Sequence, residues 1–493
     1  MFPILSIMIF LPIIVTTFLF VSRSNIQVIK LLALLTSLIV FVLATYLFIN
    51  FEAISALQFV EKYPWIEQYG ITYHIGVDGY NLMIVMAIAV LMPLVYLALW
   101  NREEKGYWYN LLLVQAGVMG AAVSFDLILF YLFWETMLLP IFFIMGLYGY
   151  EDKIYSTMKF TLYTLLGSLL MLVSILYLAV TYYNLNGEWS FLLNDLKALP
   201  LTTEEIFWVF GGFILAFGIK IPLFPFHTWL PGAYATAPSG AVVVLSSIMA
   251  KIGVYAIWRF LFFLFPQMLG SYAPYLLTLA LLGLIYFGVG AIMQRNIKRM
   301  FAYSSGSHLS LILVGLVLLN PYGWNGSIYL IGAHALSSGG LFLMVAMLYA
   351  RTKNKDVNEL GGIASQAPLF TLFFVFFSLA IVGIPGTSGF VAELLIILGA
   401  FEHSLLVGVI AASTLLLAMT FIFWMLQRVL FGETQESTEN FYDLKKNELA
   451  ALIPLALLIL VMGIMPQPFI EKFQPTVTDN LKLEMMYIKE AQK

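Results

Sequence analysis

Apolar stretches long enough to cross a bilayer recur along almost the whole length of this 493-residue chain. A hydrocarbon core about 30 Å thick requires about 20 apolar residues in one helix. Hydrophobic residues make up 61% of the sequence and charged residues only 10%, against about 25% in an ordinary soluble domain. The sequence therefore predicts an all-α polytopic membrane protein. Its first apolar stretch lacks a basic leading region and a cleavage site, so we expect a retained helix there.

The apolar stretches predict about fourteen transmembrane helices. These are expected near residues 2–22, 29–50, 79–99, 109–124, 127–149, 157–184, 205–234, 239–265, 272–292, 298–319, 323–350, 368–400, 404–430 and 448–466. The fourth to eighth and the ninth to thirteenth helices form two sets of five, and an odd number per set gives the second set the opposite orientation. We divide the chain into N-terminal helices with an interfacial loop (1–108), a first repeat (109–265), a second, inverted repeat (272–430), and a last helix with a surface tail (431–493).

Lysine and arginine residues lie mainly in the loops on one side of these predicted helices. Loops after odd-numbered helices hold Arg23, Lys30, Arg102, Lys105, Lys153, Arg295, Lys298, Arg299, Arg351, Lys353, Lys355, Arg428, Lys445 and Lys446. Loops after even-numbered helices hold only Lys62, Lys197 and Arg259. Because cytoplasmic loops carry an excess of Lys and Arg, this asymmetry predicts that both termini lie on the non-cytoplasmic side.

The fourth helix of each predicted set is interrupted by proline and glycine. The first interruption reads Lys220-Ile-Pro-Leu-Phe-Pro-Phe-His227, and the second reads Gly383-Ile-Pro-Gly-Thr-Ser-Gly389. Proline removes a backbone N–H donor and clashes with the preceding turn, so carbonyl groups are freed inside the membrane. Such breaks persist only against protein or a water-filled cavity. Broken helices at matching positions of two inverted halves indicate a transport site.

Four ionisable side chains, Glu135, Lys220, Lys251 and Glu393, lie deep inside these apolar stretches. A charge at that depth costs roughly 2.5–3.5 kcal/mol on insertion scales, so it marks an ion or proton pathway by default. A carboxylate near a lysine alters how tightly the lysine holds its proton, which suits Glu135 and Lys220 to a switchable pair. Structural roles stay open: a neutral acid bonded across helices, a lysine bonded to freed carbonyls, or a cap on a broken helix.

Histidines accompany the buried charges. His308 and His334, on the tenth and eleventh predicted helices, would bridge Lys251 and Glu393, because imidazole both gives and takes a proton near neutral pH. His227 lies inside the first break. A lone histidine on an apolar helix is more often a packed core residue, so that alternative stays open. Serines that could hold waters along this path, or serve only packing, are Ser304, Ser305, Ser307, Ser337 and Ser338.

Several classes of function find no support in the sequence. There is no cysteine, which excludes disulfides and cysteine-held iron–sulfur clusters within this chain. No glycine-rich dinucleotide or phosphate-binding pattern appears, and no histidine spacing predicts a metal site. The net charge of −3 gives no reason to expect nucleic acid as a partner. Asp78 and His74, before the third predicted helix, are expected at the membrane interface.

Five segments together resemble the antiporter-like membrane subunits of respiratory complex I. They read FYLFWETMLLP, GIKIPLFPFHTWLPGAYATAPSG, IMAKIGVYAIWRF, RNIKRMFAYSSGSHLS and GIPGTSGFVAE, and the resemblance covers roughly residues 80–465. It implies that Glu135 is the fifth-helix glutamate paired with the seventh-helix lysine, here Lys220. It further implies that Lys251 is the central relay lysine, that His308 and His334 are the central histidines, and that Glu393 ends the path where some relatives have lysine.

The resemblance implies a proton-translocating subunit of an NADH–quinone oxidoreductase in a bacterial inner membrane. It implies sibling antiporter-like subunits as neighbours, with NADH, FMN, iron–sulfur clusters and quinone bound in partner subunits and no cofactor in this chain. Two related alternatives stay open: a D-type subunit of a multi-subunit sodium/proton antiporter, and a membrane subunit of an energy-converting hydrogenase. A purely structural membrane spacer would tolerate the loss of all four buried charges.

Overall fold

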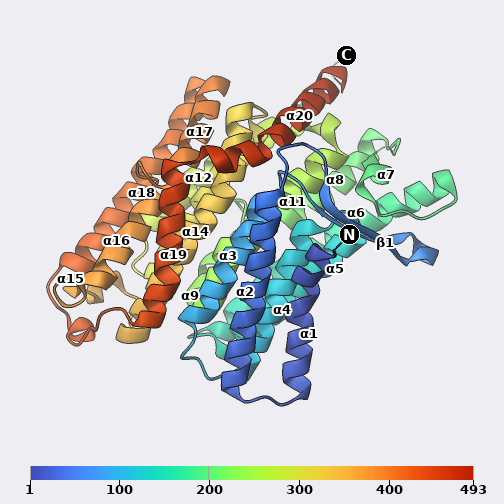
Figure 1. The fold of residues 1–493 in the computed structure, drawn as a ribbon. Coiled ribbons are helices and arrows are strands. Elements are labelled where there is room, and N and C mark those ends of the chain that lie inside the picture. Colours follow the sequence, from blue (N-terminus) through green and yellow to red (C-terminus); the bar gives the residue numbers. More distant parts are fainter. Residues whose placement is uncertain (1, 198, 492–493) are drawn as a thin grey trace.

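The computed structural model describes residues 2–197 and 199–491 and is built almost entirely of helices (Figure 1). Its N-terminal helices are α1 (Ile4–Val21), α2 (Ile26–Asn50) and α3 (Leu82–Ala98). The next group comprises α4 (Lys105–Val123), α5 (Leu127–Tyr148), α6 (Lys153–Asn186), α7 (Leu193–Lys197), α8 (Thr203–Lys220), α9 (Leu230–Thr236), α10 (Ser239–Val244) and α11 (Ala250–Ala256). The last group comprises α12 (Pro266–Ile292), α13 (Ile297–Val317), α14 (Pro321–Thr352), α15 (Ile363–Gln366), α16 (Pro368–Val382), α17 (Ser388–His403), α18 (Leu405–Phe431), α19 (Lys446–Ile464) and α20 (Gln467–Ala491).

Ten helical segments among the described residues are long and apolar enough to cross a membrane, which supports the predicted multi-pass fold. They are α1, α2, α5, α6, the continuous helix 239–262, α12, α13, α14, α18 and α19. The other predicted spans coincide with α3, α4, and the broken pairs α8–α9 and α16–α17, which are shorter or less apolar. The total of fourteen spans therefore stays a prediction.

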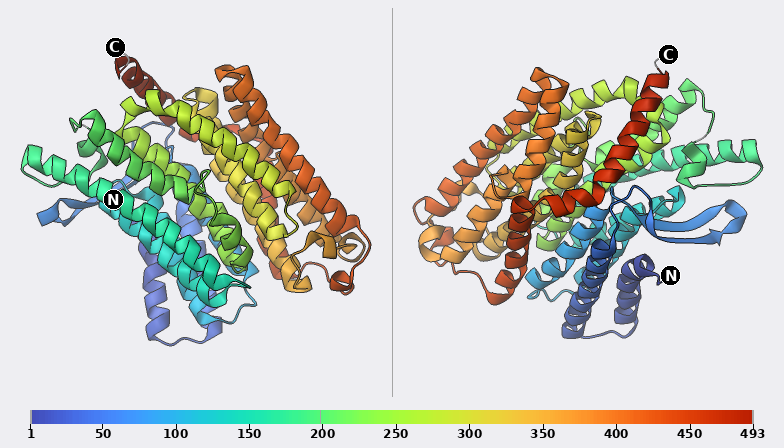
Figure 2. Two further views of the ribbon diagram at one scale, coloured as in Figure 1. Left: turned by 180° about the vertical axis from the view of Figure 1, so that it is seen from behind. Right: turned by 45° about the horizontal axis from the view of Figure 1, so that its top comes forward.

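Two groups of long helices lie side by side, as both views of Figure 2 show. In the first group α6 packs on α8, and in the second α12 packs on α13 and α14 packs on α17. The groups meet where α9 and α11 contact α13 and where α10 contacts α14. The side chains predicted to carry charge through the membrane come from both groups. Their meeting surface is therefore where a path from one group to the other would run.

Both predicted helix breaks are present. In the first group α8 ends at Lys220 and α9 begins at Leu230, with Pro222 and Pro225 between them. In the second group α16 ends at Val382 and α17 begins at Ser388. The breaks follow from the missing proline N–H groups and from the freedom of glycine to turn the backbone.

The helix 239–262 is fully buried and departs twice from regular α-helical winding. Its two wider π-helical turns are η2 (Leu245–Met249) and η3 (Ile257–Phe262), and the α-helical turn between them carries Lys251. Insertions of this kind are frequent at functional sites. Nothing in the apolar pattern of the sequence marks where the winding changes.

A two-stranded hairpin, which the all-helical prediction did not include, precedes α3. Strand β1 (Gln58–Ile66) pairs antiparallel with β2 (Ile71–Val77), and Tyr63 lies opposite Tyr73. Aromatic and β-branched residues favour strands, and Gly70 supplies the left-handed turn residue at φ 62°. Figure 2 shows the hairpin, in blue, projecting beside the bundle. The interfacial loop predicted within residues 1–108 is thus partly an ordered sheet.

The expected surface tail forms α20, which runs across the end of the bundle against α12 and α14 (Figure 1, red). One expectation made near this end was wrong: Arg259, counted as a loop residue, lies buried in η3. Asp78 is buried within the protein, and its expected place at the membrane interface stays a prediction. The two form an ion pair with an N–O distance of 2.5 Å, which removes both charges from solvent. His74, the neighbour of Asp78 in that expectation, is half-buried.

Candidate functional site

The predicted site residues lie on the faces that the two helix groups turn toward the interior. Lys220, Lys251, Glu393, His308 and His334 are all buried. Glu135 on α5 and His227 in the first break complete the set, with Glu135 half-buried and His227 buried. Five of these seven side chains carry polar atoms without a hydrogen-bond partner among the described residues: Glu135, Lys220, His227, His334 and Glu393. Buried polar atoms of this kind are normally satisfied by water, so the set matches a hydrated path.

Lys220 lies at the very end of α8, where the first break begins. Its Nζ makes no hydrogen bond to a described residue and lies 5.1 Å from the centre of the Trp134 ring. The freed carbonyl of Ile219 accepts instead from the indole N–H of Trp229, at 2.9 Å. A purely structural lysine would bond the carbonyls at the break, and here a different residue does so. The Nζ of Lys220 is therefore not tied to the break and has room to change partners.

Glu135 lies beside Trp134 on the side of α5 that faces an open groove. The groove has a volume of about 780 Å³ and is lined mainly by apolar side chains of α4, α5 and α6. No ion pair within 4.0 Å joins Glu135 to Lys220, although both are described. The predicted Glu135–Lys220 pair is thus separated in this structure, with one member at the edge of the groove and the other inside the bundle.

Lys251 lies at the meeting surface of the two groups. Its Nζ donates to the carbonyl of Ser246 in its own helix. From there hydroxyl groups continue across to α14: Ser246 Oγ lies 3.3 Å from Ser247 Oγ, which lies 3.0 Å from Ser338 Oγ. Ser338 Oγ donates to the carbonyl of His334 at 2.5 Å. Hydroxyl groups both donate and accept and can pass a proton, whereas the backbone carbonyls at the two ends of this row only accept. The row therefore spans the space between Lys251 and the histidines, and water is needed at each end to complete a path.

His308, His334 and Glu393 come together in the second group. The rings of the two histidines are 5.0 Å apart, and His308 Nε2 lies 3.4 Å from Glu393 Oε1. His308 Nδ1 faces the carbonyl of Ser304 at 2.8 Å, and its Nε2 also faces the freed carbonyl of Ile381 at 3.0 Å. Carbonyl oxygens only accept, so both contacts are satisfied when both ring nitrogens carry protons. The histidine thus ties the second break to the carboxylate.

Gly383 is required where α16 ends, because it turns the backbone directly over Glu393. Its φ is 74°, and a Cβ built on it would lie 2.8 Å from Glu393 Oε2. We expect Gly383→Ala to cost about 1–2 kcal/mol for the left-handed backbone and to displace the carboxylate as well. Gly386, at φ 93° with nothing within 4 Å of a Cβ, offers a matched control.

The measurement for this pair is thermal unfolding together with proton uptake by the assembled complex in vesicles. Both variants should unfold at lower temperature, since both force an alanine into a glycine conformation. Only Gly383→Ala should also lower proton uptake, because only its methyl group reaches Glu393. Equal uptake in the two variants would contradict the role given to this contact.

His227 borders a polar pocket of about 370 Å³. The pocket is also lined by Glu151, Lys159, Arg299 and Lys355. These residues lie on the side of the protein that carries the Lys- and Arg-rich loops, which follow the odd-numbered predicted helices. The His227 ring lies edge-on to Tyr286 and Phe287, with centroids 4.8 and 4.9 Å away, and its Nδ1 has no partner among the described residues. The pocket therefore forms a polar space between that side of the protein and the first break.

Residues 2–197 and 199–491 contain no group of three His, Asp or Glu side chains placed to hold a metal ion. Sequence reasoning passed over two residues that the geometry makes important, Trp229 and Gly383. The sequence position could have indicated each of them: Trp229 closely follows the first helix break, and Gly383 is the first residue of the second helix break. Neither residue carries a charge, so the cost of a buried charge marks neither of them.

Known proteins resemble the chain in sequence and in fold. A family described as "NADH:quinone oxidoreductase/Mrp antiporter, TM" matches residues 124–417. NADH-quinone oxidoreductase subunit M of Rickettsia conorii is 35% identical over 490 residues, covering 97% of this chain and 99% of that protein. The same motifs, with the Trp-Glu pair at 134–135, had indicated subunit M among the antiporter-like subunits, and this similarity agrees.

Solved structures extend the comparison. A chain of respiratory complex I from Thermus thermophilus, solved with bound NADH, matches with a TM-score of 0.89 and 31% identity, covering 97% of this chain and 99% of that one. A chain of the Mrp complex from a Dietzia species matches with a TM-score of 0.87 and 20% identity, covering 99% of both. At that identity the second match establishes a shared fold alone.

Proposed function

The chain belongs to the family of membrane subunits shared by NADH:quinone oxidoreductases and Mrp antiporters, and we propose that it is a proton-translocating subunit of an NADH–quinone oxidoreductase. Its relatives named subunit M match over nearly its full length. The redox chemistry belongs to partner subunits, where we place the sites for NADH, FMN, iron–sulfur clusters and quinone. The task of this chain is to move protons in response.

The relay that we propose enters from the pocket at His227 and reaches Lys220. It continues through Lys251 and the serine hydroxyls to His334 and His308, and it ends at Glu393. The observation that carries this proposal is the contact of His308 with Glu393 at 3.4 Å, with the centre of the His334 ring 5.0 Å from that of His308. Buried imidazole and carboxylate groups in contact exchange a proton with little movement of heavy atoms.

Glu135 and Lys220 form the switch of this relay. Two unit charges 4 Å apart interact by about 4 kcal/mol at an effective dielectric constant of 20. A small change in the separation of Glu135 and Lys220 therefore changes how tightly Lys220 holds its proton. Because Glu135 lies on the open groove, a sibling subunit that fills the groove would touch the switch directly. Movement in that neighbour would then drive proton transfer here.

The surroundings follow from the same proposal. Sibling antiporter-like subunits lie on both sides of this one in the membrane arm. The chain spans a bacterial inner membrane many times, with both termini on the non-cytoplasmic side. The His227 pocket, lined by residues of loops after odd-numbered helices, then opens toward the cytoplasm.

The test is made with the assembled complex in proteoliposomes. We expect NADH oxidation to drive proton uptake in step with quinone reduction, and to do so without added sodium. The second candidate, a D-type subunit of a sodium/proton antiporter, is favoured by the shared fold of the Mrp chain. An assembly without NADH-linked activity but with sodium-dependent proton exchange would decide for that candidate.

A further inference from the structure

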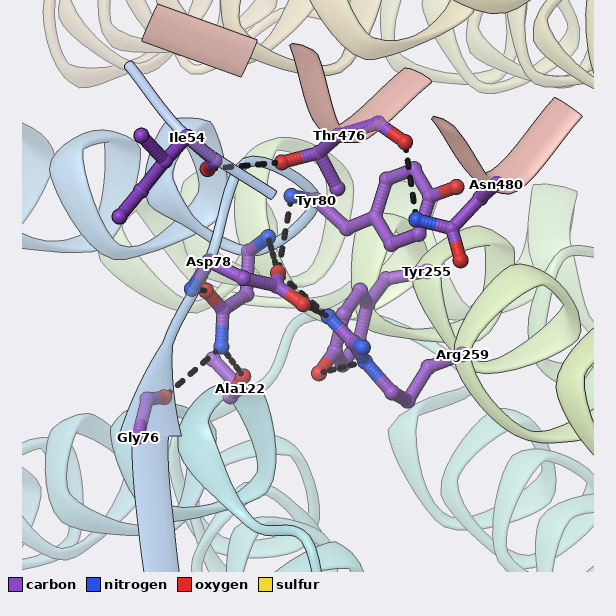
Figure 3. A network of polar contacts seen from close by, with 10 residues as sticks. Ile54, Gly76, Asp78, Tyr80, Ala122, Tyr255, Arg259, Thr476 and Asn480 are labelled. Atoms are coloured by element: carbon purple, nitrogen blue, oxygen red, sulfur yellow. Dashed lines mark hydrogen bonds and ion pairs between the residues drawn. The ribbon is translucent and has the colours of Figure 1, made fainter. Parts of the chain in front are cut away.

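A buried ion pair that the relay does not use lies near the C-terminal end of the helix 239–262, which carries Lys251 near its middle. Arg259 Nη2 contacts both carboxylate oxygens of Asp78, at 2.5 and 2.6 Å, and both side chains are under a tenth exposed (Figure 3). Asp78 Oδ1 also accepts from the backbone N–H of Tyr80 at 2.9 Å. The turn that holds Asp78 is fixed by Asn81, whose amide reaches the carbonyl of Gly76 at 3.1 Å.

A row of side chains links this ion pair to the relay. Lys251, Tyr255 and Arg259 follow one another at intervals of four residues, so they lie along one side of their helix. Arg259 Nε donates to the hydroxyl of Tyr255 at 3.0 Å, and Figure 3 shows the two side chains meeting. All three are buried. The row therefore leads from the centre of the bundle toward the end that α20 crosses.

A polar pocket lies on the far side of the ion pair. It has a volume of about 290 Å³ and is lined by Asp78 and Arg259 together with Lys62, His74, Asp195 and Asn480. Space of that size holds several waters. Its walls come from the hairpin, the loop at 51–57, the start of α7 with Leu192 before it, and α20, which all follow even-numbered predicted helices. The positive-inside argument assigns this end to the non-cytoplasmic side.

Several buried polar atoms around the ion pair lack a hydrogen-bond partner that water could supply. The hydroxyl of Tyr80, the indole nitrogen of Trp258 and Oε2 of Glu484 have no hydrogen-bond partner in the part of the chain that the structure describes. Burial raises the pKa of Glu484, on α20, to about 8, against the lowering effect of Lys197. Burial also lowers the pKa of the half-buried His74 to about 4, with Lys62 acting in the same direction. Both groups are then mostly neutral at pH 7 and add no charge near the pair.

We propose that the Asp78–Arg259 pair is a gate between the buried relay at Lys251 and a water-filled outlet on the non-cytoplasmic face. A guanidinium keeps its positive charge at physiological pH, so Arg259 standing in the row repels a proton that approaches from Lys251. While Asp78 holds it there, the gate is closed. When the pair separates, the Lys251 ammonium gives its proton through the Tyr255 hydroxyl and intervening water to water in the pocket, and Lys251 becomes neutral.

The turn that holds Asp78 is directly coupled to α20. A Cβ on Gly79 would lie 2.5 Å from Thr476 Oγ1, so the turn and the helix touch without spare room. Asn480 of the same helix lines the outlet. Figure 3 shows Thr476 and Asn480 above the Asp78 turn. A displacement of α20 would therefore carry Asp78 with it and separate Asp78 from Arg259.

The gate rests on the proposed function, and passive proton leak tests it independently of NADH. The variant Asp78→Asn/Arg259→Gln removes both charges together, so neither is left buried alone. In proteoliposomes without NADH we expect its proton leak to rise by about tenfold, which corresponds to about 1.4 kcal/mol off the barrier. Adding Lys251→Met should return the leak to the wild-type rate, because the leak would run through Lys251.

The matched control is Arg351→Gln/Glu448→Gln, which removes another largely buried pair with a 2.6 Å contact. That pair lies apart from the outlet, so its loss should leave the leak unchanged. A leak of wild-type size in Asp78→Asn/Arg259→Gln would overturn the gate, and so would a leak that persists after Lys251→Met. Failure of NADH-driven uptake in the wild-type complex would instead count against the proposed function.

Discussion

Replacing Lys220 by alanine should abolish most NADH-driven proton uptake while the complex still assembles. The Nζ of Lys220 bonds no described residue, so its removal breaks no hydrogen bond of the fold. The break itself keeps the Trp229 indole as donor to Ile219. A positioned proton donor and acceptor is worth about 10²–10⁴ in the rate of its step. We therefore expect proton uptake and coupled quinone reduction to fall by about a hundredfold, the lower end of that range.

The control is a second buried lysine that has a structural role. Lys30 lies buried on α2 and its Nζ contacts the exposed carboxylate of Glu103 at 2.6 Å. Lys30→Ala removes a lysine of comparable burial from outside the relay, and proton uptake should stay near the wild-type rate. The measurement compares protons taken up per NADH oxidised in both variants. A normal ratio in Lys220→Ala would remove Lys220 from the path.

Local physical rules made the breaks and the buried charges predictable. A single proline does not end a helix in this chain, since Pro93 and Pro140 lie inside α3 and α5. The interruptions at Pro222 and Pro385 were predictable because each of these prolines stands close to a second proline or to glycines. The cost of a charge in hydrocarbon holds for any fold, so Lys251 and Glu393 were recognisable before their neighbours were known. The contact of His308 with Glu393 needed more: the two residues lie on different helices, and only their packing brings them to 3.4 Å.

Pairing between residues far apart in the sequence could not be predicted from these local rules. Asp78 and Arg259 are 181 residues apart in sequence, and each stands near the end of an apolar stretch, where an interfacial position costs little. Nothing local indicates that the two meet inside the protein. The π-helical turns around Lys251 could not be predicted either, because a buried helix is apolar on all its faces and its sequence pattern does not change where the winding does. The separation of Glu135 from Lys220 likewise depends on how α5 and α8 pack.

The two helix breaks solve the same backbone problem with chemically different groups. In each break a ring nitrogen forms a hydrogen bond to a freed carbonyl: that of Trp229 to the carbonyl of Ile219, and that of His308 to the carbonyl of Ile381. Indole only donates and does not titrate, whereas imidazole exchanges protons near neutral pH. In the first break the group bonded to the freed carbonyl thus carries no exchangeable charge, while in the second break the bonded group is itself a proton carrier. This difference explains why the relay would end in the second group, at the carboxylate that His308 contacts.

Replacing Glu393 by glutamine tests that end of the relay. Glutamine preserves the shape of the side chain and can still accept from His308, so the packing under Gly383 is kept, and only the exchangeable proton is lost. We expect proton uptake to fall by about a hundredfold, because a positioned acid–base group contributes a factor of about 10²–10⁴ to the rate of its step. Glu393→Asp keeps the carboxylate on a shorter stem, and it should recover part of the uptake.

The matched control is Glu61→Gln in the hairpin. Glu61 is buried and accepts from the backbone N–H of Leu5 at 2.9 Å, so it caps α1 rather than serving the relay. Its loss should lower the unfolding temperature of the complex without changing protons taken up per NADH. If Glu393→Gln behaved in the same way, Glu393 would be a structural neighbour of His308. A loss of uptake without a loss of thermal stability, partly restored by aspartate, requires instead that the carboxylate itself carries the proton.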